Sequence, residues 1–177
     1  MSYCDLANAL PDNTDNPNKH YHDHEYGFPV SDDRILFERL VLEINQAGLS
    51  WTLILKKRAA FQAAYCGFDI AAVAAFDDTD RARLLADAGI IRNRLKINAA
   101  IHNAQQILAL QRGFGSFKNW LDAHHPRSKE EWVKLFKKQF KFMGGEIVGE
   151  FLMSTGYLAG AHDASCPVAE KIRAQLK

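Results

Sequence analysis

The sequence predicts an all-α protein. Apolar residues recur three or four positions apart along most of the 177-residue chain, and no stretch shows the apolar/polar alternation typical of a strand. Helix-capping residues lie where these segments begin, and glycines lie where they end. The chain shows no internal repeat and no low-complexity linker. We therefore expect one domain over residues 1–177, with a helical core at about 30–140.

The first half of the chain is expected to start as a loop, because Asp12 to Asn18 is rich in Asn, Asp and Pro. A buried helix follows from Asp32 to Gly48. Ser50 is a suitable N-cap for a second helix that runs to Gly67. A short helix is expected over residues 69–76.

In the second half, Thr79 is the expected cap of a helix that ends at Ala88. A long helix over residues 93–112 then carries apolar residues at helical spacing. Ser128 and Glu131 form a capping-box pattern before a helix over residues 132–140. Gly144 and Gly145 break that helix, and a last apolar helix is expected over residues 146–158.

Composition sets limits on function. The net charge is +1, so a nucleic-acid-binding surface would have to be a local patch. No run approaches the roughly 20 apolar residues that a membrane span needs. The N-terminus lacks the basic and apolar regions of a secretory signal, so we expect a cytoplasmic protein that does not bind a membrane. The three cysteines are too few for a disulfide framework and are better read as free thiols or metal ligands.

Cysteine and histidine residues gather near both ends of the chain. Cys4 lies near the start, and His162 and Cys166 are separated by three residues near the end. Zinc prefers thiolate and imidazole ligands, and two cysteines with two histidines would close a tetrahedron. Such an ion would be structural and would join the termini into one lobe. The alternative is a set of scattered histidines and buried thiols, and spacing alone does not choose among the N-terminal histidines His20, His22 and His24.

A glycine turn joins two predicted helices in the middle of the chain. Gly89, Ile90 and Ile91 form this turn, and Arg92 follows it. Backbone N–H groups at such a helix start suit a phosphate, as in a helix-hairpin-helix that grips the DNA backbone. A plain helical corner with a solvated basic side is the alternative. Phosphate contacts are also open to a wider set of basic residues, namely Lys56, Lys57, Arg58, Arg92, Lys137, Lys138 and Lys141.

Three stretches together resemble the 3-methyladenine DNA glycosylase I family of the helix-hairpin-helix glycosylase superfamily. They are YHDHEYG from Tyr21, LEINQAGLSW from Leu42, and DAGIIR from Asp87 with FKFMG downstream. The resemblance covers the chain from Cys4 to about Cys166. It implies a helix-hairpin-helix bundle with one structural zinc ion, and it selects a ligand set of Cys4, His22, His162 and Cys166.

The resemblance also implies an activity. Members of this family hydrolyse the N-glycosidic bond of 3-methyladenine in double-stranded DNA without forming a covalent intermediate. N3-methylation makes adenine cationic and a good leaving group, so the enzyme has to flip the base out, recognise it and place a water. A carboxylate and aromatic faces suit a cationic purine. No protein partner is implied, and a monomer is expected.

The resemblance assigns roles to individual residues. Glu43 matches the catalytic pocket carboxylate, and a carboxylate inside the apolar run Val41 to Ile44 is costly to bury without a task. Trp51 and Tyr21 match the stacking indole and the pocket tyrosine, although core packing is the commoner fate of aromatic residues. Tyr26 is also expected at the base. Gly89, Ile91 and Arg92 are expected to contact DNA.

Several positions depart from the family pattern. Leu6 and Tyr26 stand where tryptophans are usual, and Glu146 and Glu150 share one face of the last predicted helix. If that face borders the pocket, its negative charge would favour a more amine-rich or cationic ligand. Two alternatives therefore stay open: a glycosylase-like paralogue that binds DNA or another modified base, and a zinc-stapled interaction domain with no DNA role.

Overall fold

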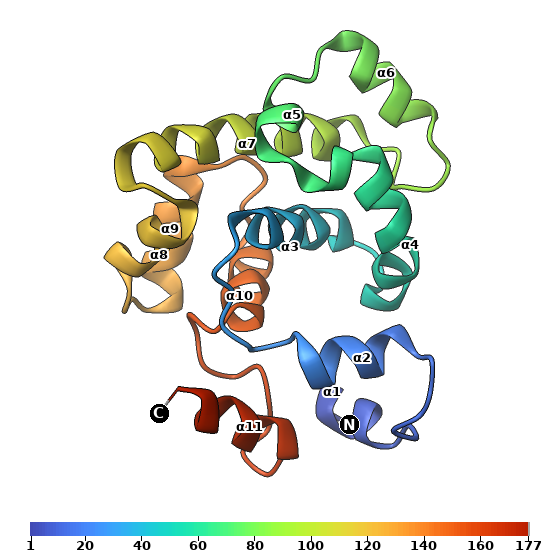
Figure 1. Ribbon diagram of the computed structural model, residues 1–177, viewed down its shortest axis with the longest axis vertical. Helices are drawn as coiled ribbons and strands as arrows, with labels where there is room; N and C mark the ends of the chain where they lie inside the picture. The colour runs from blue at the N-terminus through green and yellow to red at the C-terminus, as the bar shows by residue number, and fades with distance from the viewer. Residues whose placement is uncertain (177) are drawn as a thin grey trace.

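The computed structural model describes residues 1–176 and contains helices without strands over that range (Figure 1). The α-helices are α1 (Tyr3–Asn8), α2 (Pro17–His24), α3 (Asp33–Gln46), α4 (Trp51–Ala64), α5 (Ile70–Ala74), α6 (Asp78–Ala86), α7 (Arg94–Phe114), α8 (Phe117–His124), α9 (Lys129–Gln139), α10 (Gly145–Ser154) and α11 (Pro167–Gln175). A 3₁₀ turn at Cys66–Phe68 follows α4. None of these helices is long and apolar enough to cross a membrane.

Helix α3 is the centre of the core. It contacts α4, α7, α8 and α10, which surround it in Figure 1. Its apolar side chains from Leu36 to Ile44 are almost all fully buried. The dense apolar pattern produces this position, because a helix that is apolar on most of its circumference has to be covered by other helices.

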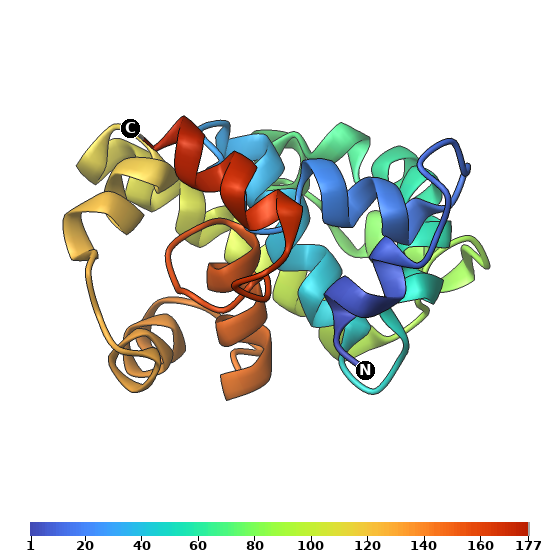
Figure 2. The ribbon, with the colours of Figure 1, turned by 90° about the horizontal axis from the view of Figure 1, so that it is seen from below.

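The two ends of the chain lie at one end of the molecule. Helices α1, α2 and α11 lie together there in two perpendicular views (Figures 1 and 2). Cys4 and Cys166 form a small buried cluster with Val168, separate from the main core. Helices α1, α2 and α11, with the segment that precedes α11, are called the terminal lobe below.

An ion-pair network joins α2, α3 and α4. Glu25 accepts two hydrogen bonds from Arg58, at 2.8 and 2.9 Å, and one from Arg39 at 2.9 Å. Arg58 also pairs with Glu38. Arg39 is 2% exposed, so the network supplies the partners that a buried charge needs. The same network commits Arg58 inside the protein, which argues against its predicted role in phosphate contact.

The structure confirms the all-α class and corrects several boundaries. Pro17 begins α2 inside the predicted loop, because Asn16 caps the helix and proline is favoured in its first turn. Asp77, not Thr79, caps α6, since its carboxylate accepts from the N–H groups of residues 79 and 80. Helix α10 ends at Ser154 instead of residue 158. The predicted capping box at Ser128 is present.

Candidate active site and metal centre

A cavity of about 680 Å³ opens where α2, α3, α4 and α10 meet. Its walls carry three tyrosines, one tryptophan, three carboxylates and two short glycine-containing segments. The lining residues are Tyr3, Tyr21, Tyr26, Glu43, Gln46, Ala47, Gly48, Trp51, Gly144, Gly145, Glu146, Ile147 and Glu150. All four predicted base-binding residues are therefore in one cavity, which is large enough for a purine.

Glu43 is the most deeply buried carboxyl of this cavity, with 4% of the residue exposed. Its pKa is raised to about 8, first by burial and then by the negative charge of Glu150. Arg39, one turn earlier on α3, lowers it. No hydrogen bond within the described residues offsets these effects. A carboxyl in this state is poised to ionise when a cation enters the cavity.

Two aromatic side chains form a wall beside Glu43. The rings of Tyr21 and Trp51 lie 5.1 Å apart at 57°. Arg39 fixes Tyr21 from behind, since its guanidinium lies 4.9 Å from the ring centroid and donates to the hydroxyl at 3.3 Å. The Trp51 Nε1 is buried without a hydrogen-bond partner. Trp51 is half-buried and lines the cavity, so core packing does not fully account for its position.

Tyr26 lies between the cavity and the chain termini. Its ring contacts those of Tyr21 and Tyr3 at centroid distances of 5.7 and 5.6 Å. Its hydroxyl donates to Glu150 Oε2 at 3.1 Å. Leu6 is 54% exposed and does not line the cavity. Of the departures from the family pattern, Tyr26, Glu146 and Glu150 therefore line the cavity and Leu6 does not.

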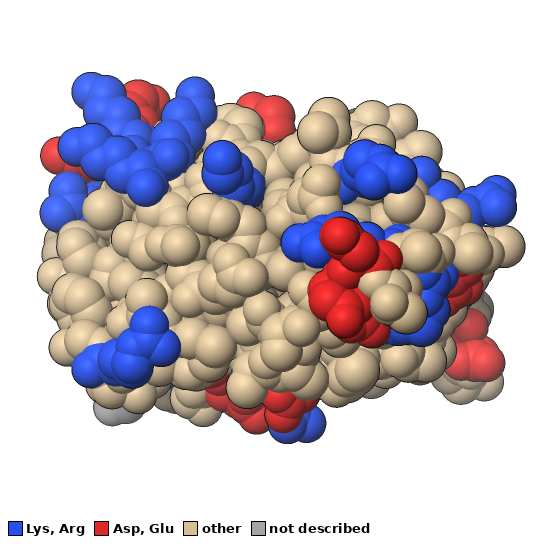
Figure 3. All heavy atoms as spheres, turned by 90° about the horizontal axis from the view of Figure 1, so that it is seen from above, with Lys and Arg blue, Asp and Glu red and all other residues tan. Residues whose placement is uncertain are grey.

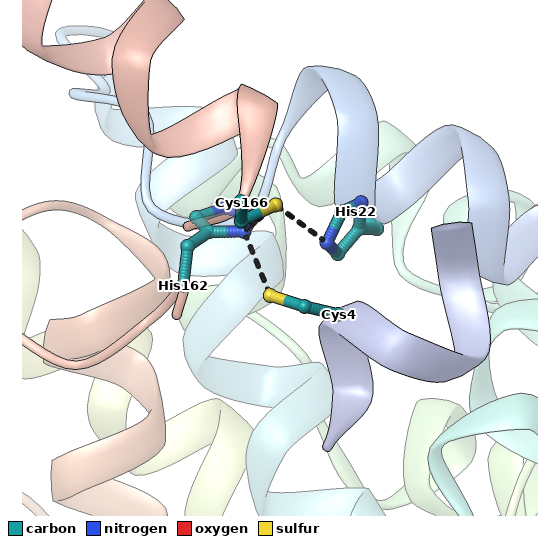
Figure 4. Close-up of side chains that lie close together, drawn as sticks. All are labelled: Cys4, His22, His162 and Cys166. Carbon is teal, nitrogen blue, oxygen red and sulfur yellow. Dashed lines mark hydrogen bonds between the residues drawn. The ribbon is translucent and has the colours of Figure 1, made fainter. Parts of the chain in front are cut away.

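Four side chains from distant parts of the chain meet in the terminal lobe (Figure 4). Cys4 comes from α1, His22 from α2, and His162 and Cys166 from the segment before and at the start of α11. Their ligand atoms all lie within 4.8 Å of one another. His20 and His24 are exposed and contact each other, with ring centroids 5.0 Å apart and the ring planes tilted by 42°. His22 is therefore the N-terminal histidine placed in the cluster.

The outer nitrogens of both histidines are already engaged. His22 Nδ1 lies 2.7 Å from Asp23 Oδ1, and His162 Nε2 lies 2.6 Å from the Tyr26 carbonyl oxygen. Second partners of this kind orient imidazoles that bind a metal through the other nitrogen. The residues present thus fit a closed site with two thiolates and two imidazoles. The contact with Tyr26 also joins this cluster to the cavity wall.

The predicted hairpin lies between α6 and α7. A Cβ at Gly89 would approach Ala60 Cβ and Asp87 Oδ1 to 3.0 Å, so close packing favours glycine there. The Gly89 N–H donates to Asp87 Oδ1 at 2.8 Å and is not free for a ligand. Ile91 packs against the core, and Arg92 is exposed. The exposed cation of this turn therefore comes from Arg92.

Two lysines tie the hairpin and the start of α7 to neighbouring elements, and one of them reaches the cavity rim. Lys57 donates to the carbonyl oxygens of Ala88 and Gly89 at 3.0 and 3.4 Å. Lys96, in the first turn of α7, is 6% exposed and donates to the Asn45 and Ala47 oxygens at 2.9 and 2.7 Å. Lys57 thus binds backbone carbonyls of the hairpin, which argues against the phosphate contact that the sequence left open for it. The sequence places Lys96 among the cations that follow the turn, but the structure buries it, in agreement with its place beside Ile97 in an apolar stretch.

The remaining basic residues form local patches. Figure 3 shows one face on which Lys and Arg side chains gather at the upper left, while most of the middle carries neither charge. Lys137, Lys138 and Lys141 are all exposed. On this face the positive charge is therefore gathered locally, on a chain whose net charge is +1.

Comparisons with known proteins assign the chain to a family. The family model described as methyladenine glycosylase matches residues 12–134. The DNA-3-methyladenine glycosylase 1 of Escherichia coli K12 is 37% identical over 165 residues, which cover 82% of this chain and 88% of the relative. The chain belongs to the methyladenine glycosylase family. A Haemophilus influenzae DNA-3-methyladenine glycosylase is 32% identical over 166 residues, covering 83% of this chain and 89% of that relative.

Solved structures of the methyladenine glycosylase family share this fold. A crystal structure of 3-methyladenine DNA glycosylase I is 35% identical, with a TM-score of 0.78 over 87% of this chain and 94% of that one. A variant of such an enzyme in complex with 3-methyladenine is 30% identical, with a TM-score of 0.79 over 95% and 97% of the two chains. The Staphylococcus aureus enzyme, in a structure on the basis of 3-methyladenine recognition, gives 0.80 at 30% identity over the same 95% and 97%.

Proposed function

We propose that the cavity around Glu43 binds and excises 3-methyladenine from double-stranded DNA. Membership of the methyladenine glycosylase family makes the chain a DNA glycosylase of this type. The observation that carries the site assignment is a carboxyl of 4% exposure beside the Tyr21–Trp51 wall. This combination suits a flat, cationic purine, which an aromatic face and a carboxylate both attract.

Glu43 would act on the base and not on the sugar. The methylated purine already carries a positive charge, so it can leave without being protonated by the enzyme. An ionised Glu43 would attract the cationic base into the cavity and hold its orientation while the bond from the base to the sugar C1′ breaks. The base would leave with the bonding electrons as neutral 3-methyladenine, and water would add to C1′ and lose a proton to solvent. Tyr21 and Trp51 cover the faces of the base and exclude solvent from it.

A monofunctional mechanism is proposed because the cavity offers no amine. No lysine is among its lining residues within positions 1–176. Without a lysine at the sugar, a Schiff base cannot form, and the DNA backbone would stay intact after base release. Trapping with borohydride is expected to give no adduct.

We assign DNA backbone contact to the hairpin around Gly89, Ile91 and Arg92. Arg92 is exposed there, Lys57 of α4 holds the hairpin carbonyls, and Lys96 joins the start of α7 to the cavity rim at Ala47. A helix-hairpin-helix role is supported by this placement, because a turn fixed to the rim would set the position of the flipped base. We expect the protein to act as a monomer.

One structural zinc ion is proposed for Cys4, His22, His162 and Cys166. When bound, the ion would supply four ligand bonds and no open position for chemistry. His162 then holds Tyr26 by donating its Nε2–H to the Tyr26 carbonyl oxygen, and the four ligands join α1 and the start of α11 to α2.

The test is the identity of the base released from methylated DNA. Duplex DNA treated with a methylating agent is incubated with the purified protein, and free bases are separated by chromatography. We expect 3-methyladenine as the main product, with no strand nicking. DNA binding without release of any base would instead favour the paralogue that recognises DNA without excision.

A further inference from the structure

Glu150 is a second carboxylate of the same cavity and comes from a different helix. Glu43 lies on α3 and Glu150 on α10, and both line the cavity. The Tyr26 hydroxyl donates to Glu150 Oε2 at 3.1 Å. Burial and the charge of Glu150 raise the pKa of Tyr26 well above its ordinary value, so the hydroxyl stays a donor. Glu150 is therefore held in the cavity wall and is not a freely solvated side chain.

The cavity contains no cation to balance these two carboxylates. No Lys or Arg is among its lining residues in the described range. Arg39 lies behind Tyr21 and is shared among the Tyr21 hydroxyl, the Glu25 carboxylate and the Ser154 carbonyl. The third carboxylate, Glu146, differs because its side chain is 91% exposed and lies 3.4 Å from Lys129 Nζ.

We propose that Glu150 is a specificity-determining residue that makes the cavity selective for permanently cationic N-alkylated purines over neutral ones. This inference rests on the proposed function of the cavity. A cation in a partly dry site gains attraction from both carboxylates, whereas a neutral purine of the same shape gains neither. The cation also relieves the repulsion between the two carboxylates, which contributes to the raised pKa of Glu43.

The test compares two free ligands that differ mainly in charge. The 3,9-dimethyladeninium ion keeps its positive charge at pH 9, while free 3-methyladenine is neutral there. Binding of each is measured by calorimetry at pH 9, because Glu43 with a pKa of about 8 is then ionised. Glu150→Gln preserves an oxygen that accepts from Tyr26 and removes only the charge.

We expect Glu150→Gln to weaken binding of the cation roughly tenfold and to change binding of the neutral base less than twofold. Glu146→Gln removes an equal charge from the exposed, Lys129-paired position, and we expect it to weaken cation binding less than threefold. Equal effects of Glu150→Gln on both ligands, or no effect on the cation, would overturn the proposal. Binding of the neutral base at wild-type affinity shows that the variant is folded.

The same protein preparation separates this inference from the proposed function. Wild-type protein that releases 3-methyladenine from DNA, but whose cation preference does not depend on Glu150, contradicts the inference alone. Wild-type protein that prefers the cation through Glu150 but releases no base contradicts the proposed excision and supports the inference.

Discussion

Replacement of Glu43 by glutamine is expected to stabilise the fold. Glu43 has an ordinary pKa of 4.5 that burial and the Glu150 charge raise to about 8 in the folded chain. Between these values the folded state binds more protons than the unfolded state, so stability is lost as the pH rises. Glutamine mimics the neutral carboxyl and avoids this loss.

The size of the effect follows from the pKa difference. Each pKa unit corresponds to about 1.4 kcal/mol. At pH 7 Glu43 is ionised in the unfolded wild type but mostly neutral in the folded state, which lowers the free energy of unfolding by about 3 kcal/mol relative to Glu43→Gln. The difference should shrink below about 1 kcal/mol near pH 5 and grow toward about 5 kcal/mol at pH 9. A stabilising mutation at a functional carboxyl is the expected trade between stability and activity.

The assay is urea unfolding of both proteins at pH 5, 7 and 9 in zinc-containing buffer. Glu38→Gln is the matched control, because Glu38 lies on the same helix and is 7% exposed but pairs with Arg58. We expect this control to be destabilised by about 1–3 kcal/mol. If Glu43→Gln were no more stable than wild type, or if its advantage did not depend on pH, the reasoning about Glu43 would be refuted.

Two further predictions concern the metal centre and the hairpin. Metal analysis should find one zinc ion per chain, and Cys166→Ala should lose this ion and have a lower melting temperature. The affinity of this variant for 3-methyladenine should also fall, because His162 holds the Tyr26 carbonyl at the cavity wall. A metal-free chain with an unchanged melting temperature would contradict this. Arg92→Ala should weaken binding of any DNA sequence and reduce the slope of log K against log salt by about 1, with unchanged binding of the free base. An unchanged salt slope would remove Arg92 from the DNA interface.

The core could be predicted from the sequence because its signals are local. The apolar density of residues 35–44 indicated a buried helix, and α3 is the helix at the centre of the fold. Glu43 stood out as a carboxylate in that apolar run. Arg39 lies among the same apolar residues but was not singled out, because its network with Glu25 joins three helices and is visible only in the tertiary structure.

Most features that the sequence alone could not predict depend on contacts between residues far apart in the chain. Spacing alone could not choose among the N-terminal histidines, and the choice of His22 required the family resemblance; the structure buries His22 fully beside Cys166. Glu146 and Glu150 were correctly placed on one helical face, but the sequence could not tell which of them Tyr26 would contact. Helices α1, α2, α8 and α11 were not predicted. Each is nine residues or shorter and carries few periods of an apolar pattern, although the equally short α5 and α6 were predicted.

The central claim is that Glu43 enables excision of the cationic base. Its most direct test is single-turnover release of 3-methyladenine from methylated duplex DNA by wild type and Glu43→Gln at pH 8, with both shown to be folded. We predict that the variant binds the DNA but releases the base roughly 10²–10³-fold more slowly, as for the loss of one preorganised electrostatic contact. Release by Glu43→Gln at the wild-type rate would contradict the account.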